Sequence, residues 1–171
     1  MFPKDHIYGL FCAIIILGDN MDIYLNNDLA NPTYLFHGSP KLLDTIEQRQ
    51  AYDSNGNIEN EDYAVFLTSS FIIASAYAFK DRIKELSDGL DWNFEIGYNS
   101  DNNEVDIKFE NVNIDDDIEG YIYIFPFSDN YEHHGRSIQY KCHENIKPLE
   151  VVKVRLGDFK KFYKISNGKT R

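Results

Sequence analysis

Apolar residues recur at helical spacing in one long segment of the chain, roughly Ser70–Leu86. They fall three or four positions apart, as they do on the buried face of an amphipathic helix. Ser69 or Ser70 is a suitable N-cap, because a serine hydroxyl accepts a hydrogen bond from a free N–H of the first turn. The pattern therefore predicts one long helix, whose core stripe is Ile72, Ala76, Phe79 and Ile83.

Short apolar or alternating runs flank this helix and predict strands. Before it we expect strands at Tyr34–His37 and about Ala64–Leu67, with a short helix at about Leu42–Gln48 between them. The strands expected after it are about Trp92–Gly97, Val105–Phe109, Tyr121–Phe125, Ser137–Cys142, Leu149–Val154 and Phe162–Ile165, with a hairpin turn around Asn99–Asn103. Helices early and antiparallel strands late indicate an α+β fold.

The N-terminus carries a ten-residue apolar run, Tyr8–Leu17. This run is too short to span a bilayer. It also lacks the strongly basic start and the small-x-small cleavage site of a secretory signal. We expect a buried strand, a short helix, or an extension ahead of Met21. Residues 1–20 are accordingly taken as an N-terminal extension that need not belong to the core, and 21–171 as a single domain.

The composition narrows the classes of partner. Twelve Tyr and 12 Phe favour a β-rich fold. The formal net charge of −11 argues against general nucleic-acid binding and against binding to anionic membranes, because both need a basic face. An anionic ligand would need a local positive group, for which the candidates are Lys80, Arg82, Arg136 and Lys141.

Metal-binding patterns are weak along the chain, and we expect no metal cofactor. Cys12 and Cys142 are far apart, which gives no metal spacing and fits a reduced cytoplasmic compartment, although the arithmetic allows one bridge. The acidic run Asp115–Glu119 lacks the alternating ligands of a calcium loop. In "YEHHG" the adjacent histidines cannot easily face one ion, so we expect a loop that touches substrate or is simply exposed.

The strongest candidate chemistry begins at "TYLFHGSP", where His37-Gly38 ends a predicted strand. A glycine there lets backbone amide and carbonyl groups approach a ligand without an intervening Cβ. Ala74 and Tyr77 share one helix face, so the small residue would leave room while the ring stacks. Phe66 could close the site from the other side. This set would suit a planar aromatic ligand that carries a carboxamide.

Three segments resemble the signature motifs of the ADP-ribosyltransferase superfamily, in the histidine class that includes poly-ADP-ribose polymerases and diphtheria-type toxins. They are "LFHGS", "VFLTSSFIIASAYAF" and "SIQYKCHENIKPLEVVKV", and the resemblance covers about Thr33 to Val154. It implies a split β-sandwich of two mostly antiparallel sheets with a few helices around an NAD cleft. NAD would be the substrate.

The resemblance also implies roles for individual residues. His37 matches the histidine that hydrogen-bonds the adenosine-side ribose of NAD, and Gly38 the glycine whose backbone grips the nicotinamide carboxamide. Tyr77 matches the second stacking tyrosine, and Phe66 stands where the first usually is. Ala74 occupies the position of a serine that bonds the carboxamide in the polymerases, so one contact is lost.

Gln139 stands at the position of the catalytic glutamate. Breaking the glycosidic bond of NAD builds positive charge on the ribose, which a carboxylate stabilises and a neutral amide does not. Losing one such group typically costs roughly a hundred- to a thousand-fold in rate. We therefore expect transfer of single ADP-ribose units rather than chain elongation. Glu132 and Glu144 are nearby carboxylates that could substitute.

The sequence thus predicts an NAD-dependent mono-ADP-ribosyltransferase that modifies an unidentified protein or nucleic-acid acceptor, in the cytoplasm or as a delivered, toxin-like effector. A module of the same fold that binds NAD, ADP-ribose or a partner protein without turnover is the main alternative. An RNA 2′-phosphotransferase fits less well, because the charge is −11 and no arginine immediately precedes His37. The last alternative is a structural protein, in which His37 bonds a neighbouring carbonyl, Tyr77 is plain core and Gly38 lies in a turn.

Overall fold

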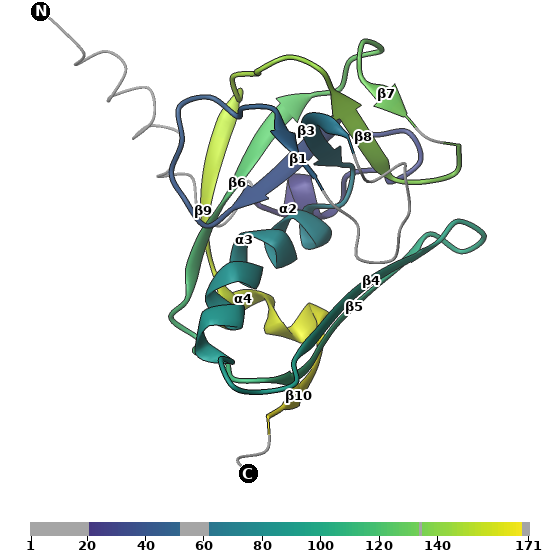
Figure 1. Cartoon of the computed structure of the whole chain (residues 1–171). Helices are drawn as coiled ribbons and strands as arrows, with labels where there is room; N and C mark the ends of the chain where they lie inside the picture. The colour runs from purple at the N-terminus through teal and green to yellow at the C-terminus, as the bar shows by residue number, and fades with distance from the viewer. Residues whose placement is uncertain (1–20, 52–61, 134, 169–171) are drawn as a thin grey trace, which may run out of the picture.

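Two β-sheets and one long helix make up the part of the chain that the computed structural model describes, which is residues 21–51, 62–133 and 135–168 (Figure 1). The apolar run Tyr8–Leu17 and Cys12 lie outside the described residues. The sheets are mostly antiparallel and the helices few, which confirms the predicted α+β class. No helix in the described ranges is both long and apolar enough to cross a membrane.

The larger sheet has seven strands, six of them in the order β7-β8-β3-β1-β6-β9, with β2 pairing beside β3. All of its pairings are antiparallel. Its strands are β1 (Tyr34–Ser39), β2 (Arg49–Gln50), β3 (Tyr63–Thr68), β6 (Glu119–Pro126), β7 (Glu132–His133), β8 (Gln139–Cys142) and β9 (Glu150–Arg155).

The smaller sheet has three strands in the order β10-β5-β4. They are β4 (Asn93–Asn99), β5 (Glu104–Val112) and β10 (Lys164–Asn167). β4 and β5 form the predicted hairpin, and Asn103 in its turn has a positive φ of 57°, which asparagine tolerates better than most residues. β10 runs parallel to β5 and begins later than predicted, because a 3₁₀ turn occupies Lys160–Phe162.

Helix α3 (Phe71–Leu86) begins as predicted after Ser70, whose side chain accepts a hydrogen bond from the Ile73 N–H at 3.1 Å. It crosses one face of the larger sheet, with the β4–β5 hairpin beyond it (Figure 1). Of the predicted stripe, Ala76, Phe79 and Ile83 are buried and Ile72 is half-buried. Two short helices, α2 (Met21–Leu25) and α4 (Leu156–Phe159), were not predicted.

The short helix predicted at Leu42–Gln48 is wrong. This segment forms bends, and Ile46 makes an isolated antiparallel bridge to Ile146. An isolated helix this short is marginal, whereas the bridge lets Ile46 bury all but 2% of its surface. Tertiary burial therefore decides the conformation of this segment.

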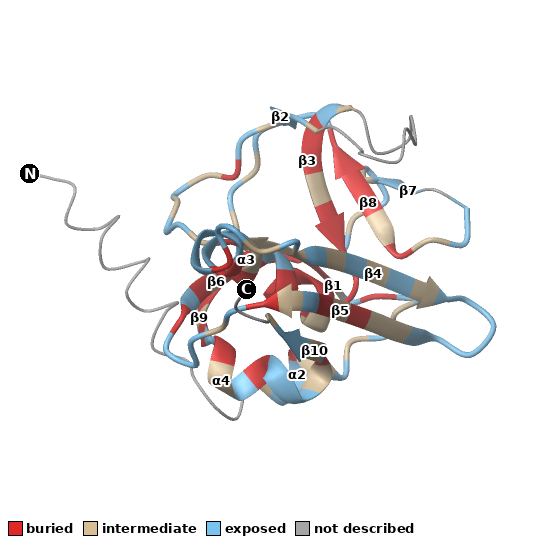
Figure 2. Cartoon of the chain, turned by 60° about the horizontal axis from the view of Figure 1, so that its bottom comes forward, coloured by how far each residue is buried: buried red, intermediate tan, exposed pale blue. Residues whose placement is uncertain are grey.

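Buried side chains form a separate cluster on each face of the larger sheet. Phe36 belongs to the cluster under α3, which also includes residues of the smaller sheet such as Phe109. Leu35 belongs to the cluster on the opposite face. Burial is concentrated in the larger sheet and α3, whereas β4 alternates between half-buried and exposed positions (Figure 2). The hairpin thus has one face toward α3 and one toward solvent.

Candidate functional site

The two central strands of the larger sheet separate at the predicted His-Gly motif. The ladder between β1 and β3 contains a single pair, Phe36 with Thr68. Further along, β3 pairs with β2 instead, through Arg49 and Ala64, while β1 stays paired with β6. The sheet is therefore split beside His37 and Gly38.

His37 spans this split. Its Nδ1 lies 2.8 Å from the Phe66 carbonyl oxygen on β3. Burial lowers the pKa of His37 to about 4, with a smaller contribution in the same direction from the charge of Arg49. The imidazole is therefore neutral at pH 7, Nδ1 donates to the carbonyl, and Nε2 keeps a lone pair that can accept a hydrogen bond.

Gly38 is required by the packing of α3. A Cβ at this position would lie 1.8 Å from the carbonyl oxygen of Ala74 and 2.9 Å from the Ala78 nitrogen. Ala74 itself is only 1% exposed. The room that the sequence analysis expected above Ala74 is filled by the helix backbone, so a ligand could meet Gly38 only along the edge of its strand.

Tyr77 lies one helical turn after Ala74 and is 44% exposed, so it is not the plain core residue of the structural alternative. Its ring packs edge-on against Phe94 of β4, with centroids 5.8 Å apart. The Lys80 ammonium lies 5.9 Å from the Tyr77 ring centroid and 5.1 Å from that of Phe94. The helix thus presents an aromatic ring and a cation together toward the hairpin.

Phe66 and Gln139 lie on neighbouring strands and on the same face of the sheet. Gln139 on β8 is opposite Thr68 of β3. Phe66 is two residues before Thr68 on the same strand, so its side chain points to the same face, where it is opposite Lys141. The Lys141 ammonium lies 5.6 Å from the Phe66 ring centroid. Gln139 is half-buried, and within the described residues its side-chain amide makes no hydrogen bond.

The three signature segments therefore meet around the split in the sheet. β3 carries Phe66 between His37 and the strand of Gln139. Gly38 contacts the helix turn that leads to Tyr77. Phe66 and Gln139 lie on the α3 face of the sheet, as Phe36 does, because cross-strand partners share a face. His37 alternates with Phe36 and is opposite Tyr123, so its imidazole belongs to the other face, with the two ring centroids 6.4 Å apart.

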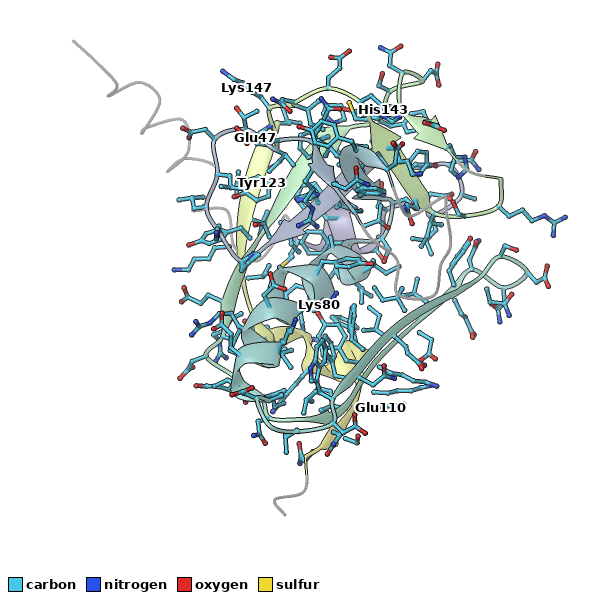
Figure 3. The ribbon with its side chains drawn as sticks, viewed as in Figure 1. Glu47, Lys80, Glu110, Tyr123, His143 and Lys147 are labelled. Atoms are coloured by element: carbon cyan, nitrogen blue, oxygen red, sulfur yellow. The ribbon has the colours of Figure 1, made fainter. Side chains whose placement is uncertain are left out.

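Arg49 is a site residue that the sequence analysis missed. Burial is the main cause that lowers the pKa of His37, and the charge of Arg49 adds a smaller contribution in the same direction. Burial also lowers the pKa of Lys80, with smaller contributions from the charges of Lys84 and then Arg49. Lys80 projects from the middle of α3 (Figure 3). Both Arg49 and Lys80 are cationic in a chain of net charge −11. No local pattern pointed to Arg49, because the short strand β2 that carries it was not predicted.

Strand β7, which carries Glu132 and His133 of the "YEHHG" segment, pairs with β8 opposite Lys141 and Tyr140. His133 stacks on Tyr140 with ring centroids 4.3 Å apart and lines a surface hollow together with Phe127 and Tyr131. That hollow contains none of the residues expected to bind NAD. Glu144 is exposed. Cys142 is buried and its thiol is free.

No protein-family model matches the chain, and no curated protein or solved structure does. The functional interpretation therefore depends on the geometry of the site and on the resemblance of its motifs.

Proposed function

We propose that the protein is an NAD-dependent mono-ADP-ribosyltransferase that modifies an unidentified protein or nucleic-acid acceptor. The observation that carries the proposal is the separation of β1 and β3 at His37-Gly38. The bond between His37 Nδ1 and the Phe66 carbonyl oxygen across the split is also what the structural alternative expects, so it does not discriminate between the two. A split of this kind leaves the edge of a central strand available to a ligand's amide group.

The surrounding residues supply the interactions that NAD needs. The free Nε2 of His37 accepts a hydrogen bond from a ribose hydroxyl. The Gly38 backbone edge offers a donor and an acceptor to the nicotinamide carboxamide. The rings of Tyr77 and Phe66 suit stacking on the nicotinamide. Arg49 and Lys80 place positive charge where a diphosphate would be stabilised.

In the proposed reaction the bond between the ribose C1′ and the nicotinamide nitrogen breaks, and its electron pair leaves with nicotinamide. A nucleophile of the acceptor then forms the new bond to C1′ and loses its proton. Gln139 can hydrogen-bond a ribose hydroxyl but brings no negative charge to the cationic transition state. Slow, single transfers follow, because one missing electrostatic group costs roughly a hundred- to a thousand-fold.

Calorimetric titration of the purified chain with NAD and with nicotinamide tests the binding step. We expect saturable binding that Tyr77→Ala weakens at least about ten-fold, since stacked aromatic contacts contribute on the order of 1 kcal/mol or more. Tyr63→Ala is the matched control, because Tyr63 is 57% exposed at the other end of β3. Absence of saturation by either ligand would contradict the proposal.

Gln139→Glu tests the catalytic assignment. If the amide occupies the catalytic position, the carboxylate should raise NAD turnover by roughly ten- to a thousand-fold. Release of nicotinamide from labelled NAD measures it directly. NAD binding that persists with no gain in turnover would remove Gln139 from the catalytic role.

The second candidate is a module that binds NAD or ADP-ribose, or a partner protein, without turnover. The neutral Gln139 favours it, together with Phe66 and Ala74 at positions where the family usually has a tyrosine and a serine. The packed contact between Gly38 and Ala74 instead favours a structural protein without a ligand. Incubating the protein with labelled NAD and cell lysate separates the two candidates. Label on protein or nucleic acid supports the transferase, and binding without transfer supports the module. A toxin-like effector role is part of the first proposal only through the motif resemblance.

A further inference from the structure

Three residues with metal-binding side chains meet at the end of β8 that lies away from Gln139. Asp62 immediately precedes β3, Glu132 is in β7, and His143 immediately follows β8. β7, β8 and β3 are adjacent in the sheet. Figure 3 shows His143 beside these strands, well away from Lys80 on α3. Asp62 therefore meets two residues far along the chain, which are themselves 11 positions apart on the paired strands β7 and β8.

The spacing of their ligand atoms fits a shared cation. His143 Nε2 lies 3.0 Å from Glu132 Oε2 and 3.5 Å from Asp62 Oδ2. One ligand atom from each residue can be chosen so that all three lie within 4.8 Å of one another. Nitrogen and oxygen ligands bind Zn²⁺ at about 2.0–2.2 Å, so ligands of one ion are roughly 3.0–3.5 Å apart. The two distances from Nε2 fall in that range.

The orientation of the imidazole is fixed from outside the group. His143 Nδ1 lies 3.3 Å from the Tyr63 carbonyl oxygen. When Nδ1 carries the proton and donates to this carbonyl, the Nε2 lone pair faces the two carboxylates. Metal-binding histidines are commonly held by such a bond from their second ring nitrogen.

We propose that Asp62, Glu132 and His143 bind a divalent transition-metal cation of the Zn²⁺ class. One imidazole and two carboxylates suit first-row divalent ions, whereas all-oxygen sites suit Ca²⁺ and Mg²⁺. The side chains of His143 and Glu132 are 49% and 50% exposed and that of Asp62 is 39% exposed, so water can complete the coordination. The cation would connect three neighbouring strands at the edge of the sheet.

The competing explanation is a metal-free ion pair. Without a cation, the hydrogen bond that protonated His143 Nε2 donates to Glu132 is the largest cause that raises the pKa of His143, and the charge of Asp62 acts in the same direction. The two explanations differ in what happens when a cation is supplied. A metal site must bind the cation with defined stoichiometry through all three residues. An ion pair gives only weak cation binding, whose affinity does not change when the imidazole is removed.

Calorimetric titration of the EDTA-treated full chain with Zn²⁺ is the test. We expect one site with a dissociation constant in the micromolar range or below. His143→Ala, Asp62→Asn and Glu132→Gln should each weaken binding at least ten-fold. Asp62→Asn is nearly isosteric, and circular dichroism and thermal unfolding establish that each variant is folded. The Zn²⁺-dependent rise in Tm should be lost in the same three variants.

His133→Ala is the matched control, because this neighbouring histidine is on the same strand as Glu132 but its Nε2 contacts the Ser137 carbonyl. It should leave the Zn²⁺ affinity unchanged. Binding that survives His143→Ala, or that His133→Ala removes, would overturn the proposal, as would millimolar affinity in the wild type. The titration is carried out without NAD, so its outcome is independent of NAD binding. Of the three residues only Glu132 was considered for the NAD chemistry, as a substitute carboxylate, and Asp62→Asn and His143→Ala test the metal site without it.

Discussion

The molecule contains two histidines anchored in the same way but placed in opposite surroundings. His37 and His143 each direct Nδ1 to a carbonyl oxygen of β3, on Phe66 at 2.8 Å and on Tyr63 at 3.3 Å. His37 is enclosed beside the split in the sheet, and burial lowers its pKa to about 4. His143 lies at the surface, and its hydrogen bond with Glu132 is the first cause that raises its pKa.

The comparison shows that the backbone anchor sets the direction of an imidazole, while its surroundings set its charge. A desolvated ring stays neutral and offers a lone pair to a neutral hydrogen-bond donor such as a hydroxyl. A solvated ring beside carboxylates holds a proton, or a cation that replaces the proton.

The largest effect is expected from Gly38→Ala, which changes the packing of α3 next to His37. The new Cβ would overlap the Ala74 carbonyl oxygen at 1.8 Å, so α3 must move away from β1. We expect a loss of about 3 kcal/mol or more in the free energy of unfolding, measured by urea denaturation. In the control Gly97→Ala the nearest heavy atom to the Cβ is 3.8 Å away, so the change should be small. Equal effects at the two glycines would contradict the packing role of Gly38.

The next effect is a pH dependence that belongs to His37 alone. Its folded-state pKa of about 4 lies below the ordinary histidine value of 6.5, so the unfolded chain binds the proton more readily. Stability should therefore fall as the pH drops from about 6.5 to 4, by on the order of 2–3 kcal/mol. His37→Gln keeps a donor for the Phe66 carbonyl oxygen and removes the titration. Urea denaturation at pH 7, 5 and 4 should show a smaller loss in the variant, and parallel losses would refute the assignment.

The smallest effect is expected at the exposed histidine. In metal-free buffer with EDTA, Glu132→Gln should lower the pKa of His143 toward 6.5, because the main cause that raises it is removed. An NMR titration of the imidazole resonances measures this shift, and the His37 resonance serves as an internal control that should not move. An unchanged His143 pKa would show that Glu132 does not hold it in solution.

Local sequence patterns predicted the elements that carry their own signal. The apolar stripe of α3 and its Ser70 N-cap could be predicted, because helical spacing and a hydroxyl at the start of the helix are local features of the sequence. The β4–β5 hairpin was readable from its Asn-rich turn. The segment Leu42–Gln48 was not, because its conformation depends on a bridge to Ile146 about a hundred residues away.

The residues of the candidate sites likewise include some that motifs predicted and others that only the structure revealed. The motif order predicted a site of six residues, and the structure places the segments that carry them beside one split in the sheet. They are His37, Gly38, Phe66, Ala74, Tyr77 and Gln139. Nothing local indicated Arg49, or that Gly38 is needed for helix packing. The "YEHHG" segment was considered for metal by itself, whereas Glu132 instead meets Asp62 and His143.

The sequence by itself determined the positions of α3 and most strands, the α+β class and the acidic balance, because periodicity, capping and charge are properties of neighbouring residues. Only the tertiary structure decided where the sheet splits, which imidazole is neutral, and which carboxylates face His143. Those properties depend on desolvation and on distances between segments far apart in the chain, and no local pattern records either.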